Sequence, residues 1–222
     1  MRKYLWLWII GLFLTSCSAS NEIMMNNDTQ KQESQIVEAG TILALWDSLT
    51  AWYGLNISES YPSKLEAKLI ENNYDYKIIN GWVSWDTSKN LLDRAQLYVD
   101  QDPNIVLIVI GWNDGLRAQS IFDLQANIQS IIDMYEWKST IVLGWMEILP
   151  IHGLSYARDF KQVYYDIADD NPNVYFLESF LKDVGWVERF NQVDRIHPTS
   201  EWYDIIVKNL YEFLEDEDII QK

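Results

Sequence analysis

The chain has 222 residues, of which 48% are hydrophobic and 23% charged, a composition typical of a globular protein with one sizeable core. It carries 17 basic and 33 acidic residues, which gives a formal net charge of −16 at neutral pH. Such an acidic balance lacks the electrostatic features that bind nucleic acid or an anionic membrane surface, and we expect neither as a partner.

The N-terminus is predicted to be a targeting segment. Arg2 and Lys3 precede an apolar run over residues 4–14, which is too short to span a bilayer as a helix. The run is followed by Thr15-Ser16-Cys17 and resembles a bacterial lipoprotein signal, in which cleavage leaves Cys17 as the lipidated first residue. An ordinary secretory signal with an incidental cysteine is the alternative. Because Cys17 is the only cysteine, neither a disulfide framework nor a cysteine-based metal site is expected.

The remaining chain divides into a linker and one domain. Residues 18–38 are rich in Asn, Gln, Ser and Glu and lack a hydrophobic period, so we expect a flexible polar tether. After the signal segment of residues 1–17 and this tether, a single domain is expected over residues 39–218. The protein would then be a monomer in the cell envelope, anchored to a membrane through Cys17 and facing the extracytoplasmic side.

Strands and helices are predicted to alternate along this domain. Five short segments are predicted to be strands, and the third of them is an unbroken apolar run: residues 41–45, 76–80, 105–110, 140–144 and 174–177. Helical spacing of apolar residues predicts helices from residue 61 and over residues 88–101, 121–135, 156–168 and 201–215. This alternation favours an α/β fold, a three-layer α/β/α sandwich with a five-stranded parallel sheet. Its active site is expected beyond the carboxyl ends of the strands.

Ser48, directly after the first predicted strand, is a candidate nucleophile. A serine hydroxyl needs a positioned base, and the chain has only two histidines. One of them, His197, follows Asp194 by three residues in Asp194-Arg195-Ile196-His197-Pro198, so a carboxylate is available to orient the imidazole. The Asp-Ser dipeptide alone is more typical of a helix cap or a turn.

Four blocks in one order strengthen this interpretation: Asp47-Ser48, residues 81–88 (GWVSWDTS), residues 111–115 (GWNDG) and residues 194–197. With these blocks the sequence resembles the GDSL, or SGNH, hydrolase family over about residues 41–213. Within that family it is most similar to the bacterial branch of acyl thioesterase I, lysophospholipase and arylesterase. The resemblance implies the flavodoxin-like SGNH hydrolase fold.

The resemblance also implies roles for individual residues. Ser48 would be the nucleophile, His197 the general base and then acid, and Asp194 the residue that orients His197. The oxyanion hole would be formed by the backbone N–H of Ser48, the backbone N–H of Trp85 and the side-chain amide of Asn113, whose two N–H donors carry no charge. The implied substrates are small acyl esters, with lysophospholipids as candidates, and no metal or cofactor is implied.

Other polar residues in the blocks have structural interpretations. Asp47, Asp86 and Asp114 are expected to cap helices and brace turns rather than to perform acid–base or metal chemistry. No zinc spacing, phosphate-binding glycine loop or Gly-x-Ser-x-Gly elbow is present in the sequence. His152 is expected at the surface, with a place at the rim of the substrate site as the alternative.

Tryptophan repeatedly occupies positions where the family pattern has glycine: Trp46, Trp52, Trp82, Trp85, Trp112 and Trp202. The chain has 11 tryptophans and only 9 glycines. One explanation is that the nine tryptophans after the signal segment correspond to codons, UGA being the obvious candidate, that the source organism reads as glycine. The other is a genuine relative whose site is filled by tryptophan and is inactive. The codon hypothesis does not explain Arg195, where family members often have glycine.

Three functions follow from this pattern. The first is a serine esterase or thioesterase that acts through a Ser-His-Asp triad and an acyl-enzyme intermediate. The second is an O-deacetylase of envelope polysaccharide, which the acidic surface and envelope location permit. The third is a catalytically inactive binding lipoprotein on the same fold.

Overall fold

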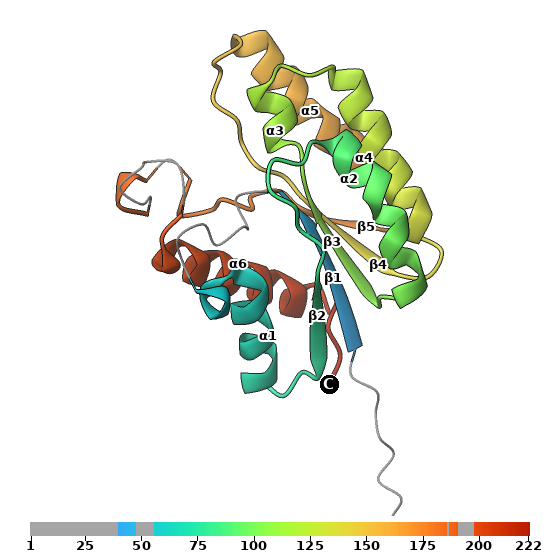
Figure 1. Ribbon diagram of the computed structural model, residues 1–222, viewed down its shortest axis with the longest axis vertical. Coiled ribbons are helices and arrows are strands. Elements are labelled where there is room, and N and C mark those ends of the chain that lie inside the picture. Colours follow the sequence, from blue (N-terminus) through green and yellow to red (C-terminus); the bar gives the residue numbers. More distant parts are fainter. Residues whose placement is uncertain (1–39, 48–55, 186, 191–197) are drawn as a thin grey trace, which may run out of the picture. The chain divides into compact units, whose positions relative to one another are not determined.

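The computed structural model describes residues 40–47, 56–185, 187–190 and 198–222 (Figure 1), all within one compact unit that comprises residues 38–222. Its strands are β1 (Gly40–Trp46), β2 (Tyr76–Asn80), β3 (Ile105–Val109), β4 (Thr140–Gly144) and β5 (Val174–Leu177). Its α-helices are α1 (Tyr61–Glu71), α2 (Ser88–Ala95), α3 (Trp112–Leu116), α4 (Ile121–Tyr135), α5 (Leu154–Asp170) and α6 (Ser200–Asp216). The predicted signal segment and tether lie outside the described residues, so their boundaries stay predictions.

The strands form one sheet in the order β2-β1-β3-β4-β5, and every neighbouring pair is parallel. Ala44 of β1, for example, lies between Asn80 of β2 and Leu107 of β3. All five residues of β3 are buried, as expected for an apolar strand covered on both faces. The predicted five-stranded parallel sheet is thus confirmed.

Helices cover both faces of the sheet, so the fold has the three predicted layers (Figure 1). Ile42, Ala44 and Trp46 of β1 belong to a core cluster with α1 and α6, whereas Leu43 and Leu45 belong to a second cluster with α2, α4 and α5. This division follows from the alternation of side chains along a strand. The C-terminal Ile219 and Ile220, which follow the predicted end of the domain, are buried in the first cluster.

The helix starts follow local capping chemistry. Thr87 accepts a hydrogen bond from the backbone N–H of Asn90, whose side chain accepts one from the backbone N–H of Thr87, forming a capping box for α2. Ser120 and Thr199 accept equivalent bonds at the starts of α4 and α6. Each cap fixes where the chain leaves a loop at the carboxyl edge of the sheet and enters a helix.

Two helical predictions differ from the structure. The segment 88–101 is an α-helix only to Ala95 and continues as a 3-10 helix, η3 (Gln96–Gln101), which ends at Asp102 in the left-handed conformation (φ 49°). The short helix α3 was not predicted, because five residues that include Gly115 carry no helical period.

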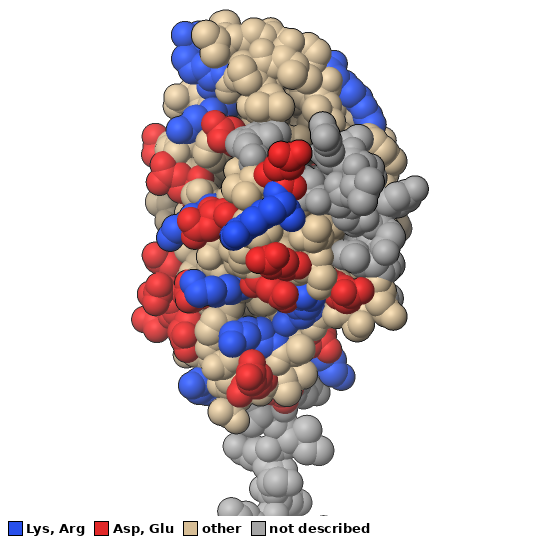
Figure 2. All heavy atoms as spheres, turned by 90° about the vertical axis from the view of Figure 1, so that its left-hand side faces the viewer, with Lys and Arg blue, Asp and Glu red and all other residues tan. Residues whose placement is uncertain are grey.

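The face formed by α1 and α6 carries charges of both signs, and Figure 2 shows acidic and basic side chains interleaved there. Lys64 of α1 pairs with Asp204 of α6, and Lys208 pairs with Glu212 at 3.0 Å. Among the described residues, no helix has the length and apolar character needed to cross a membrane.

Candidate active site

Three neighbouring strands bring three of the four sequence blocks to the carboxyl edge of the sheet. β1 ends at Trp46 and is followed by Asp47, which is fully buried. β2 leads into residues 81–87, and β3 leads through Gly111 into α3. Gly111 has φ 109°, and a Cβ there would approach the Tyr164 hydroxyl to 2.1 Å, so glycine is required at this turn.

Asn113 joins the second and third blocks. It lies in α3, is 1% exposed, and its Nδ2 donates to the backbone oxygen of Asp86 at 3.0 Å. This bond uses one of the two N–H groups of the amide. Asn113, the predicted oxyanion donor, is therefore buried where α3 meets the 81–87 loop.

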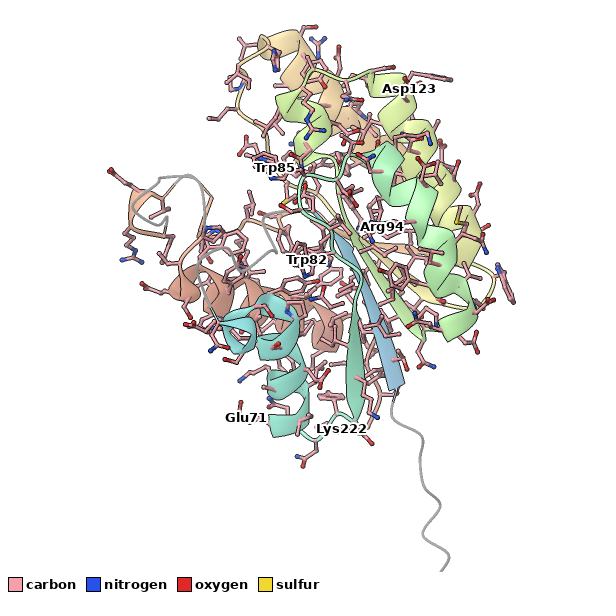
Figure 3. The ribbon with its side chains drawn as sticks, viewed as in Figure 1. Glu71, Trp82, Trp85, Arg94, Asp123 and Lys222 are labelled. Carbon is pink, nitrogen blue, oxygen red and sulfur yellow. The ribbon has the colours of Figure 1, made fainter. Side chains whose placement is uncertain are left out.

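Trp85, the second predicted oxyanion position, lies on the connection between β2 and α2 (Figure 3). Its backbone has φ 66° and its side chain is 57% exposed. Arg117, which follows α3, donates from Nη2 to the backbone oxygen of Trp85 at 3.2 Å. The loop is thereby held from the α3 side by both Asn113 and Arg117.

Arg94 is a residue that the sequence analysis missed. From the last turn of α2 its Nε donates to the Asp86 carboxylate at 2.6 Å, and the two side chains are only 14% and 10% exposed. The same guanidinium donates to the backbone oxygens of Gly81 and, at 3.4 Å, of Trp46. Arg94 thus connects the 81–87 loop to the end of β1, the strand that precedes Ser48.

A second carboxylate links α3 to α2. Asp114, 2% exposed, accepts hydrogen bonds from the backbone N–H of Ser88 at 2.8 Å and from its hydroxyl at 2.6 Å. Asn127 of α4 donates to the same hydroxyl at 2.9 Å. Burial raises the pKa of Asp114, and its hydrogen bonds from Ser88 oppose that shift.

Asp86 and Asp114 therefore brace loops, as expected, but neither of them caps a helix. Thr87 caps α2, and Asp114 lies inside α3. His152 is exposed, and its Nε2 lies 2.9 Å from the backbone oxygen of Leu116 at the end of α3. Within the described ranges, no group of three or more His, Cys, Asp or Glu side chains is placed to hold a metal ion.

Ser48, Asp194, His197 and Cys17 lie outside the described residues. The structure does describe segments close in sequence to Ser48 and to His197. Trp46 at the end of β1 packs against Phe180 with ring centroids 4.5 Å apart, and Phe180 packs against Trp202 in the first turn of α6 at 6.5 Å. Trp46, two residues before Ser48, and Trp202, five residues after His197, thus belong to one aromatic cluster.

A doubly covered parallel sheet with polar loops gathered at the carboxyl ends of its central strands defines an α/β enzyme of the SGNH hydrolase type. The chain belongs to the GDSL-like lipase/acylhydrolase family, whose model matches residues 44–205. This membership makes the protein a serine ester hydrolase.

Relatives with assigned activities are esterases. Esterase TesA of Pseudomonas aeruginosa is 31% identical over 185 residues, which cover 82% of this chain and 91% of that protein. An arylesterase of Vibrio mimicus is 33% identical over 162 residues, covering 72% and 80% of the two chains. Thioesterase 1/protease 1/lysophospholipase L1 of Escherichia coli is 28% identical over 165 residues, covering 73% and 77%.

Solved structures of esterases have the same fold as this chain. The crystal structure of TesA superposes with a TM-score of 0.74 at 30% identity and covers 79% of this chain and 98% of its own. The psychrotrophic esterase EstA from Pseudoalteromonas, inhibited by monoethylphosphonate, also has a TM-score of 0.74, at 28% identity, and covers 80% and 97%.

Proposed function

We propose that the protein hydrolyses acyl esters and thioesters, including lysophospholipids, through a Ser48-His197-Asp194 triad and an acyl-enzyme intermediate. The observation that carries this proposal is the convergence of the β1 end, the 81–87 loop and Asn113 at one edge of the sheet, tied together by Arg94 and Asp86. The names of the Escherichia coli relative include both thioesterase and lysophospholipase, which supports the substrate range.

Acylation begins when the Ser48 hydroxyl attacks the substrate carbonyl carbon and transfers its proton to His197. Asp194 stabilises the resulting imidazolium. Negative charge develops on the carbonyl oxygen and is met by the N–H groups of Ser48 and residue 85 and by the Asn113 amide. Collapse of this intermediate breaks the bond to the leaving alcohol or thiol, which takes the proton from His197.

Deacylation repeats these steps with water. His197 accepts a proton from the water molecule as its oxygen attacks the acyl carbon, and the bond to the Ser48 oxygen then breaks. The proton on His197 returns to Ser48 and the fatty acid leaves. The enzyme is restored without a cofactor.

The test is hydrolysis of a p-nitrophenyl ester series by two soluble chains that begin near Val37, one as printed and one with the nine tryptophans after the signal segment replaced by glycine. The substitutions below are made in the chain that is active. Ser48→Ala is expected to lower kcat by about 10⁶ and Asp194→Asn by about 10⁴. Ser58→Ala, at an exposed serine, is the matched control and is expected to keep full activity. A Ser48→Ala chain as active as the control would refute the mechanism. Preference for acetylated sugars over acyl chains would favour the deacetylase. If the printed chain and the glycine chain were both folded and inert, the binding lipoprotein would be favoured.

We also propose that the mature protein is a monomer held in the cell envelope by lipid on Cys17. The support is the sequence pattern of residues 2–17. Phase partitioning in a detergent solution tests the anchor, because the full-length protein is expected in the detergent phase and Cys17→Ser in the aqueous phase. Sedimentation of the soluble chain tests the monomer.

A further inference from the structure

Trp85 adopts a backbone conformation that a tryptophan rarely takes. Its φ of 66° lies in the left-handed region, where a Cβ crowds the following peptide group. Six residues other than glycine share positive φ in the described chain, and four of them are Asn or Asp, which tolerate it. Trp85 is the only aromatic residue among them. With 57% of its surface exposed, its packing does little to offset the strain. Glycine would take this conformation without strain.

Trp46 is a second position of interest, because its indole N–H is buried without a hydrogen-bond partner among the described residues. It is 1% exposed, and its ring centroid lies 3.9 Å from that of Tyr61. Its Nε1 and the Tyr61 hydroxyl are both buried without a hydrogen-bond partner in the described part of the chain. Buried indole N–H groups usually find an acceptor. The ring also occupies the end of β1, next to Asp47 and the predicted nucleophile.

Two further tryptophans follow the ends of elements. Trp145 directly follows β4, and its Nε1 is buried without a hydrogen-bond partner among the residues that the structure describes. Trp137 comes two residues after the end of α4, where helices often carry glycine, and is 72% exposed. Strained, poorly satisfied or exposed indoles at the ends of elements fit a glycine position better than a tryptophan position.

We infer that the natural protein carries glycine at the nine positions Trp46, Trp52, Trp82, Trp85, Trp112, Trp137, Trp145, Trp186 and Trp202. A single codon that the source organism reads as glycine would account for all nine. The substitution would double the glycine count from nine, which brings it near the usual share of about 7% of residues. The end of β1 and the 81–87 loop would then lose the indoles of residues 46 and 85.

The test is peptide mass spectrometry of the protein isolated from its own organism. A peptide covering residues 78–89 contains Trp82 and Trp85, and it is expected to be lighter than the printed sequence by two indolylmethyl groups, each replaced by hydrogen. All nine positions should show glycine, and the gene should use the same codon at each. Tryptophan at all nine positions would overturn the inference, and a mixture would overturn its single-codon cause.

This test reads mass and not activity, so it is independent of the proposed hydrolysis. A chain with glycine at all nine positions that hydrolyses no ester would sink the proposed function and leave this inference standing. As a second readout, Trp85→Gly in the printed sequence is expected to raise the midpoint of thermal unfolding. A lowered midpoint would contradict the argument from backbone strain.

Discussion

Replacing Arg94 by glutamine tests whether the buried ion pair holds the site together. The change leaves the Asp86 carboxylate, 10% exposed, without its charged partner, and it weakens the bonds to the Gly81 and Trp46 carbonyls. Removing one partner of a buried ion pair typically costs 3–5 kcal/mol. Because both side chains retain some exposure, we expect a loss of about 3 kcal/mol in the free energy of unfolding. For a domain of this size that corresponds to a drop of roughly 6–12 °C in Tm.

The assay is thermal unfolding of the soluble chain, followed by circular dichroism, with Lys89→Gln as the matched control. Lys89 lies on the same helix and pairs with Asp93, but both side chains are about 60% exposed. An exposed pair contributes about 0–1 kcal/mol, so the control should barely shift Tm. Equal shifts in the two variants would refute the reasoning.

Arg94 is also expected to act as a positioning residue. It reaches the 81–87 loop and the end of β1, so its loss should misplace the groups that meet the developing oxyanion. We expect kcat to fall by up to about 10²–10³, the effect of losing one oxyanion donor, with KM little changed. Arg94→Lys should recover part of kcat, measured well below Tm. A purely structural role would leave kcat unchanged at that temperature.

Three further predictions follow from the site and the core. Asn113→Ala should lower kcat by about 10²–10³ without raising KM, whereas Asn209→Ala on α6 should leave kcat unchanged in the same ester assay. The pKa of Asp114 is raised in the folded protein, so its protonated form favours folding. The wild type therefore loses stability as pH rises from the ordinary pKa of 3.8 through the raised pKa of the folded protein. The stability advantage of wild type over Asp114→Asn should therefore shrink across that range in urea titrations, and a growing advantage would contradict the sign. Ile128→Ala, at a fully buried position of α4, should cost about 2–5 kcal/mol, while Phe122→Ala, 77% exposed, should cost under about 0.5 kcal/mol.

The sheet was predictable because short strand-like segments alternate with segments of helical spacing. Residues 76–80, 140–144 and 174–177 were assigned with the observed bounds, although β2 and β5 are edge strands that are only partly buried. The change from α-helix to 3-10 helix after Ala95 was not predictable, because both conformations accept the same local sequence.

Only those site residues that lie within the sequence blocks could be predicted. Asn113 and the 81–87 loop were predicted to lie at the same edge because each follows a strand of one parallel sheet. The role of Arg94 was not predicted, because one partner lies in a loop eight residues earlier and another at the end of a distant strand. No periodic sequence pattern connects these positions. The triad residues themselves lie outside the described chain, and their geometry stays a prediction.

The strand order has a consequence for folding. β1 lies inside the sheet, between β2 and β3, although it is the first of the described strands to be synthesised. One of its edges therefore stays unpaired until β3 is available, and β1 is almost entirely apolar. Such an edge is a template for association with other chains. A fragment that ends before residue 105 should thus aggregate rather than remain as a soluble half-sheet.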